Sequence, residues 1–277
     1  MGHGESVFRR LHEEPGIFVI PNPWDIGSAR ILANLGFKAL ATTSAGLAFS
    51  MGRAEGDVTP EEVLRHCKDI AGATSLPVSA DLESGFGNSP ESAAETIRAA
   101  AVTGLSGASL EDFSGNPEAP IYDFALAVER VHAAAEAARA LPEDFVFTAR
   151  CENLLYGLPD LDAVIRRLQA YEQAGADVLY APGLRDLESI RTVCSSVSRP
   201  VNVVMGLPGA VFTVAELADA GVKRISVGAA LARLAYTAVV DAAKAMHDPG
   251  SFAWAGGAMG FAPLEALVTG TGAPPAP

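Results

Sequence analysis

Short runs rich in apolar and β-branched residues alternate with segments of helical length along most of the chain. Several helical segments end in a glycine just before the next run, where Gly36 or Gly175 can take a left-handed cap conformation. Helix starts are marked by Thr59 and Ser89, each followed by proline and early acidic residues. The runs predict eight strands, at residues 17–20, 39–43, 77–83, 107–111, 145–150, 177–181, 200–205 and 224–227.

Eight such units in 277 residues are what a closed (β/α)₈ barrel, the TIM barrel, requires. An open doubly wound sheet is the alternative, but it usually has a glycine-rich first turn, whereas the first turn here reads NPWD. Residues 229–247 predict a long helix after the last strand. We therefore predict an α/β protein with one barrel domain over residues 1–248 and a C-terminal helical extension, partly coil, over residues 249–277.

The chain has 33 acidic and 20 basic residues, so its formal net charge is -13 and its isoelectric point is near 4.8. This charge disfavours nucleic acids and anionic membranes as partners, because both would repel it. The three cysteines have spacings that fit neither a disulfide framework nor a zinc motif. No apolar stretch is long enough to cross a bilayer. We therefore predict a cytoplasmic protein with no nucleic-acid or membrane partner.

Polar residues follow the third, fourth and fifth predicted strands at their carboxyl ends, where the active sites of barrel enzymes lie. Residues two apart share a face of a strand, so Asp81 and Glu83 should project together. Glu111 ends the next strand and Arg150 the one after it. Clustered carboxylate oxygens suit Mg²⁺, or Mn²⁺, whereas zinc usually recruits His or Cys. The sequence therefore predicts a magnesium site held by Asp81, Glu83 and Glu111.

An arginine and small residues beside these carboxylates suggest a site for an organic anion. The guanidinium of Arg150 matches two carboxylate oxygens in a planar fork, and backbone N–H groups around Ser44, Ala45 and Gly46 could complete the anion site. We take Arg150 and Ser44 as the candidate catalytic residues. Asn202 is a further candidate for substrate contact if the register of its strand turns it inward.

Two aromatic residues at loops of this end are further candidates for the site. Trp24 is a candidate for the pocket floor, with a core aromatic at the barrel rim as the alternative. Tyr156, in the loop after the fifth strand, is a candidate proton donor.

The commonest catalytic bases are absent from the predicted strand ends. All four lysines precede strands or lie on helices, which argues against a Schiff-base aldolase. The five histidines lie in helices or at the amino terminus. What remains is carboxylates, one arginine, hydroxyls and backbone amides, a set that suits a reaction in which a metal polarises an oxo or carboxylate oxygen and stabilises an enolate.

Three segments give these residues a familiar context: residues 78–87 read VSADLESGFG, residues 110–112 read LED, and residues 148–152 read TARCE. Together they resemble the isocitrate lyase and phosphoenolpyruvate mutase superfamily. Residues 22–36 resemble its first strand and helix, and residues 42–52 resemble its oxo-acid loop after the second strand. The resemblance covers most of the barrel.

The resemblance implies a Mg²⁺-dependent enzyme that acts on small 2-oxo or 2-hydroxy carboxylates through an enolpyruvate-like intermediate. It also implies a homodimer or homotetramer with an exchanged C-terminal helix. By position, Asp81 would bind the metal directly, with Glu83 and Glu111 acting partly through water and Glu55 or Asp57 behind them. Arg150 and the segment Thr43, Ser44, Ala45 and Gly46 would hold the oxo-carboxylate of the substrate.

The chain departs from this family pattern in the loop after the fourth strand. The family's lyases carry a Lys-Lys-Cys-Gly-His type sequence there, whose cysteine is the acid-base catalyst, whereas residues 113–120 read FSGNPEAP. The phosphonomutases use a lysine and an asparagine in this region, and only Asn116 could correspond to the asparagine. Decarboxylation of a 3-carboxy-2-oxo acid needs no base to start it, because the leaving carboxylate supplies the electrons.

We therefore favour a Mg²⁺-dependent lyase that decarboxylates an oxaloacetate-type acid or cleaves a carbon–carbon bond. The first alternative is a non-catalytic or weakly catalytic protein that binds a 2-oxo-dicarboxylate. A further alternative is 2-methylisocitrate lyase, or carboxyphosphonoenolpyruvate or phosphoenolpyruvate phosphonomutase activity. A phosphate-handling barrel that uses amides near residues 226–228 is also considered, but no Lys or Arg is expected beside them on the catalytic side.

Overall fold

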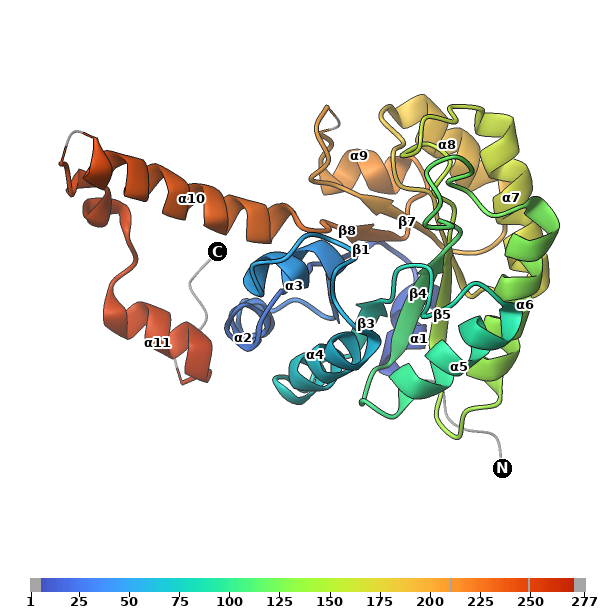
Figure 1. Cartoon of the computed structure of the whole chain (residues 1–277), viewed down its shortest axis with the longest axis horizontal. Helices are drawn as coiled ribbons and strands as arrows, with labels where there is room; N and C mark the ends of the chain where they lie inside the picture. The colour runs from blue at the N-terminus through green and yellow to red at the C-terminus, as the bar shows by residue number, and fades with distance from the viewer. Residues whose placement is uncertain (1–5, 210, 249, 272–277) are drawn as a thin grey trace.

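The computed structural model describes residues 6–209, 211–248 and 250–271, and most of these form the predicted TIM barrel (Figure 1). All neighbouring strands are parallel, in the order β1-β8-β7-β6-β5-β4-β3-β2. The N–H of Ala41 donates to the carbonyl of Pro21 at 3.0 Å and so links β2 to the segment after β1. The strands are β1 (Phe18–Ile20), β2 (Leu40–Ala41), β3 (Val78–Asp81), β4 (Gly107–Glu111), β5 (Val146–Arg150), β6 (Val178–Tyr180), β7 (Val201–Val204) and β8 (Arg224–Ser226).

Helices alternate with the strands and cover the outside of the barrel, where buried apolar side chains form the main core. The predicted caps are confirmed, since Thr59 and Ser89 are N-caps and Gly175 is a left-handed C-cap with φ 108°. The helices are α1 (Val7–Glu13), α2 (Ile26–Asn34), α3 (Ser44–Ser50), α4 (Pro60–Gly72), α5 (Pro90–Ala101), α6 (Phe124–Arg139), α7 (Leu161–Ala174), α8 (Leu187–Ser196), α9 (Val214–Asp219), α10 (Ala230–His247), the 3₁₀-helix η1 (Ala253–Gly257) and α11 (Phe261–Thr269).

Most strands are shorter than the sequence suggested, and for β3 and β2 the difference affects the site. β3 ends at Asp81, and Glu83 adopts a left-handed backbone conformation with φ 52°, so strand parity does not set its direction. β2 contains only Leu40 and Ala41. The predicted loop after it contains the short helix α3, whose N-cap Thr43 accepts from the N–H of Gly46. The sequence suggested a loop in this segment because small polar residues favour turns and helix caps alike.

Helix α1 closes the amino-terminal end of the barrel. Phe8 packs with Phe18, Val146 and Val178 in a small apolar cluster inside the barrel. Buried His12, also on α1, makes a 2.8 Å contact from Nδ1 to the carbonyl of Phe8 and edge-on ring contacts with the rings of Phe8 and Phe18. α1 therefore fills the end of the barrel opposite the predicted site.

The burial of His12 predicts a loss of stability in mild acid. Burial, and the positive charges of Arg224 and Lys223, lower the pKa of His12 from 6.5 to about 3. The folded state therefore keeps His12 neutral, while the unfolded chain gains a proton below pH 6.5. This difference should lower the free energy of unfolding by about 2 kcal/mol between pH 7 and pH 5. Urea titrations at both pH values should show this loss in the parent and a smaller loss in His12→Gln; equal losses would contradict the assignment.

Helix α10 projects away from the barrel and leads into the C-terminal extension (Figure 1). α11 of the extension contacts α2, and Asn34 Nδ2 donates to the carbonyl of Leu267 at 2.6 Å. Several large apolar side chains of α10 and of the extension are exposed, notably Leu234, Val239, Phe252 and Phe261. The final part of the predicted coil, residues 272–277, lies outside the described residues. Within the described part of the chain, no helix combines the length and apolar character needed to span a membrane.

Candidate active site

A cavity of about 590 Å³ opens among the carboxyl ends of the strands and extends down into the barrel. Three predicted site residues do not line it, and these are Trp24, Gly46 and Asp57. The remaining predicted site residues all contribute to its wall, namely Thr43, Ser44, Ala45, Glu55, Asp81, Glu83, Glu111, Arg150 and Asn202.

Packing explains why Trp24 and Gly46 lie outside the cavity. A Cβ atom on Gly46 would lie only 2.9 Å from Cβ of Trp24, so the glycine lets α3 pack closely on the indole side. The Gly46 N–H is used within the helix cap, because it donates to Thr43 Oγ1 at 3.2 Å. The amide of Gly46 is therefore not an anion donor in this structure, and half-buried Trp24 fits the alternative of a packing aromatic.

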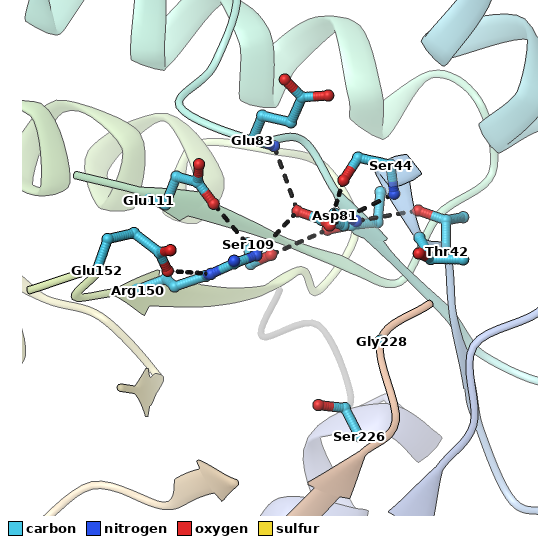
Figure 2. A network of polar contacts seen from close by, with 12 residues as sticks. Thr42, Ser44, Asp81, Glu83, Ser109, Glu111, Arg150, Glu152, Ser226 and Gly228 are labelled. Carbon is cyan, nitrogen blue, oxygen red and sulfur yellow. Dashed lines mark hydrogen bonds and ion pairs between the residues drawn. The ribbon is translucent and has the colours of Figure 1, made fainter. Parts of the chain in front are cut away.

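Arg150 lies at the centre of a group of carboxylates (Figure 2). Its Nη1 is 3.2 Å from Glu111 Oε2 and 3.4 Å from Asp81 Oδ1, and its Nε donates to Glu152 Oε1. Glu111 and Arg150 are also direct neighbours across the β4–β5 ladder. Burial disfavours the charged guanidinium, but the attraction of these carboxylates outweighs it and raises the pKa of Arg150 well above its usual value. Arg150 is therefore a permanent cation.

Asp81 connects this group to the segment after β2. Its Oδ2 accepts from Ser44 Oγ at 2.9 Å, and its backbone N–H donates to Thr42 Oγ1 at 3.0 Å. Ser44 Oγ also lies 3.1 Å from Glu55 Oε1. The hydroxyl of Ser44 therefore lies between the carboxylates of Asp81 and Glu55.

Glu83 reaches the cavity through a turn rather than along a strand. Its N–H donates to Asp81 Oδ1 at 3.3 Å, and Figure 2 shows its carboxylate turned away from Arg150. A left-handed conformation costs a non-glycine residue about 1–2 kcal/mol, and such outliers cluster at functional sites. Burial, together with repulsion by Asp81 and Glu55, raises the pKa of Glu83 to about 7.

The donor set fits a hard divalent cation by its chemistry. Negative charge is in surplus here, because the site combines the guanidinium of Arg150 with the carboxylates of four residues, Asp81, Glu83, Glu111 and Glu152. Burial raises the pKa of Glu111 well above its usual value. A bound cation would relieve this repulsion. Among the described residues, however, no three His, Cys, Asp or Glu side chains are arranged so that they could hold a metal ion together. Nη1 of Arg150 lies between Asp81 and Glu111, so cation binding would require these side chains to rearrange.

A buried polar network behind the site positions Glu152. Its backbone N–H donates to Asp112 Oδ1 at 2.7 Å, and the other Asp112 oxygen accepts from Tyr171 at 2.6 Å and Arg167 at 3.3 Å. These contacts fix the residue that pairs with Arg150. The sequence placed Asp112 beside Glu111 but could not show that α7 supplies its partners.

The loops after β4 and β5 form an aromatic wall of the cavity. Phe113 and Tyr156 stack with ring centroids 4.3 Å apart and planes 10° from parallel. Burial and the nearby carboxylates raise the pKa of Tyr156 to about 12, so its hydroxyl stays protonated at neutral pH. Tyr156 therefore meets two requirements of the predicted proton donor: access to the cavity and a proton to give.

Sequence reasoning missed two residues inside the barrel. Tyr180 lies near Arg150, whose guanidinium carbon is 5.2 Å from its ring centroid, and Arg224 lies deeper in the same cavity. Strand parity was the available signal, because Arg224 and Ser226 lie on the same face of β8. The sequence expectation concerned the catalytic side of Ser226, whereas Arg224 precedes Ser226 on the strand and lines the cavity from inside the barrel.

Comparison with known proteins shows the family and supports the barrel fold. The family model described as phosphoenolpyruvate phosphomutase matches residues 8–247. The chain belongs to this family. A solved structure from Burkholderia cenocepacia J2315, named provisionally as a lyase/mutase, superposes with a TM-score of 0.92 and 53% identity over 94% of this chain and 93% of that one.

Two characterised relatives within the same superfamily are more distant. The 2-methylisocitrate lyase of Escherichia coli is 31% identical over 204 residues, which are 70% of this chain and 68% of that protein. The oxaloacetate decarboxylase of Pseudomonas fluorescens is 30% identical over 223 residues, 78% of this chain and 75% of that protein. This phosphoenolpyruvate phosphomutase family member therefore lies in a superfamily whose members include lyases and hydrolases of oxo acids.

Proposed function

We propose that this protein is a Mg²⁺-dependent lyase of a small 2-oxo carboxylic acid and that it favours oxaloacetate-type decarboxylation. One observation carries the proposal: none of the described residues that line the cavity is Lys, His or Cys. The lining offers carboxylates, arginines and hydroxyls instead. A reaction that needs no base to begin fits such a lining best, and relatives named oxaloacetate decarboxylase and 2-methylisocitrate lyase add support.

In this proposal the residues divide the work between binding and proton transfer. Asp81, Glu83 and Glu111 would hold Mg²⁺, which when bound supplies Lewis-acid polarisation of the 2-oxo group. Arg150 orients the carboxylate that stays. When the other carboxylate leaves as carbon dioxide, the electron pair of the broken bond remains in an enolate of pyruvate. That enolate takes one proton, and Tyr156 Oη is a protonated group at the cavity wall.

A substrate panel tests the reaction. The protein with Mg²⁺ is incubated with oxaloacetate, 2-methylisocitrate, isocitrate, phosphonopyruvate or 2-oxoglutarate, and pyruvate and carbon dioxide are measured. We expect release from oxaloacetate only, at a rate above that of Mg²⁺ without protein. EDTA should abolish the excess rate and added Mg²⁺ should restore it; full activity in EDTA would contradict the magnesium role.

The panel also separates the alternatives. Release of pyruvate from 2-methylisocitrate would indicate the 2-methylisocitrate lyase reaction instead of decarboxylation. Turnover of phosphonopyruvate would indicate the phosphonomutase reaction. Ligand binding without any product would indicate the non-catalytic 2-oxo-dicarboxylate-binding protein.

The proposal includes a homodimer or homotetramer, with α10 and the C-terminal extension as the contact between copies. Leu234 and Val239 on α10 are more than 60% exposed, and Phe261 on α11 is 95% exposed. Exposed apolar patches of this kind are typical of protein interfaces. Light scattering should report a dimer or tetramer for the parent and a smaller species for Leu234→Asp with Val239→Asp. A monomeric parent at micromolar concentration would refute this part.

A further inference from the structure

Arg224 extends from the first position of β8 into the interior of the barrel, where it is only 5% exposed. Its Nη2 donates to Thr148 Oγ1 on β5 at 3.1 Å, so the side chain crosses the barrel. Thr148 precedes Arg150 by two residues on the same strand, and each residue of a strand rises about 3.3 Å. The guanidinium of Arg224 therefore lies roughly 7 Å below the level of Arg150.

The register of the sheet explains this position. Arg150, Tyr180, Asn202 and Arg224 are successive neighbours across the β5–β6–β7–β8 ladders. Because barrel strands are tilted, a row of such neighbours moves along the barrel axis as it passes around the sheet. The contact between Arg224 and Thr148 reflects this stagger.

The charge of Arg224 has no carboxylate partner among the described residues. No ion pair of the described structure includes Arg224. Its other contacts are Asn202 Oδ1 at 2.8 Å and Nε2 of neutral His12 at 3.2 Å. Burial lowers the pKa of Arg224 to about 10, which still leaves it charged at neutral pH. Buried charges are normally paired, so this cation lacks a counterion.

Arg224 faces the cavity with spare hydrogen-bonding capacity. A guanidinium has five N–H groups, and the three described contacts use three of them. The cavity reaches this depth because Ser79 and Ser109, which are small, line it at the inner faces of β3 and β4. The upper wall is acidic around Arg150, whereas the floor carries an uncompensated positive charge.

We propose that Arg224 is the centre of a second carboxylate site, which holds the distal carboxylate of a dicarboxylic 2-oxo or 2-hydroxy acid. The hydroxyls of Tyr180 and Ser226 line the same part of the cavity and can contribute hydrogen bonds. This inference rests on the proposed function, and it makes Arg224 the residue that selects diacids over monoacids. In decarboxylation the distal carboxylate is the group that leaves as neutral carbon dioxide, so Arg224 contributes to binding of the diacid and not to the rate of the chemical step. One guanidinium among neutral groups balances one carboxylate, whereas a phosphate dianion would keep an unbalanced charge.

Two stable four-carbon acids test the site, because malate and 2-hydroxybutyrate differ by a carboxylate in place of a methyl group. Their affinities are measured by calorimetry with Mg²⁺ present. A charge-assisted hydrogen bond is worth about a 10- to 100-fold change in affinity, so the parent should bind malate at least about 10-fold more tightly. Arg224→Met should lower the affinity for malate to that for 2-hydroxybutyrate and should leave the affinity for 2-hydroxybutyrate unchanged.

Asn202→Asp tests the same point without removing the arginine. The new carboxylate would replace an amide whose oxygen lies 2.8 Å from Arg224 Nε, so it would neutralise the guanidinium from within the protein. It should abolish the preference for malate, as Arg224→Met does, and its circular dichroism spectrum should match that of the parent.

The outcomes separate this inference from the proposed function. An unchanged preference for malate in the Asn202→Asp protein, or an equal loss of both ligands in both variants, would overturn the carboxylate site and leave the proposed function standing. Competition by inorganic phosphate that is stronger than malate would also overturn it. If the parent binds neither acid, the proposed function fails and this inference fails with it.

Discussion

Arg150→Ala should lower kcat/KM for the 2-oxo acid by about 100- to 1000-fold, which is the usual effect of removing one preorganised donor that contacts the reacting group. The alanine removes the guanidinium that contacts Glu111 and Asp81 and leaves both carboxylates without that partner. In the proposed reaction it also removes the group that orients the substrate carboxylate. Steady-state kinetics on oxaloacetate, with Mg²⁺-only blanks, measures the effect.

The affinity for Mg²⁺ should not fall in Arg150→Ala, in contrast to kcat/KM, and this difference separates the two roles of the site. Nη1 of Arg150 lies between Asp81 and Glu111, so its removal frees carboxylate oxygens for a cation. Calorimetry should therefore find Mg²⁺ affinity unchanged or higher in Arg150→Ala. Arg150→Lys should recover only part of the activity, because an ammonium group cannot form the planar two-point contact.

Arg9→Ala is the matched control for Arg150→Ala. Arg9 also pairs with two carboxylates, Asp144 at 2.7 Å and Asp177 at 2.9 Å, but it does so at the amino-terminal end of the barrel. It should lower stability without lowering kcat/KM. If Arg150→Ala keeps the parent rate, or if Arg9→Ala loses as much activity, the role given to Arg150 is wrong.

The convergence of Asp81, Glu111 and Arg150 could be predicted from the sequence because it depends on regular structure. Each ends a strand, and parallel strands of a barrel end on the same side. β4 is confirmed at both predicted bounds, which made the position of Glu111 secure. Register then places Glu111 directly beside Arg150. Such positions follow from periodicity and topology alone.

Glu83 and Arg224 were harder to place, for different physical reasons. β3 ends two residues earlier than predicted, and a left-handed turn sets the direction of the Glu83 side chain. No local sequence rule requires this conformation of a glutamate. Arg224 begins its strand and so seemed remote from the site. Only the stagger of the closed sheet and the length of the side chain bring it beneath the cavity. Both positions depend on tertiary geometry rather than on residue spacing.

Asp81→Asn should weaken Mg²⁺ binding by more than about 100-fold, since changing even the groups that support metal ligands typically costs 10- to 100-fold. The substitution keeps the shape of the side chain but removes the charge at a position that contacts Ser44, Glu83 and Arg150. Burial and neighbouring carboxylates raise the pKa of Glu83 and of Glu111, so these two groups hold their protons more tightly than usual.

Calorimetric titration with Mg²⁺ measures this effect, and activity should fall in proportion to the lost occupancy. Ser44→Ala removes the hydroxyl that supports Asp81 without removing a carboxylate, so it should weaken Mg²⁺ binding by about 10- to 100-fold, less than Asp81→Asn does. Asp186→Asn is the surface control, because Asp186 caps α8 away from the cavity and should leave Mg²⁺ binding unchanged. Parent-like Mg²⁺ affinity in Asp81→Asn would mean that the cation is held elsewhere, because a hard divalent ion does not keep its affinity when a central carboxylate becomes an amide.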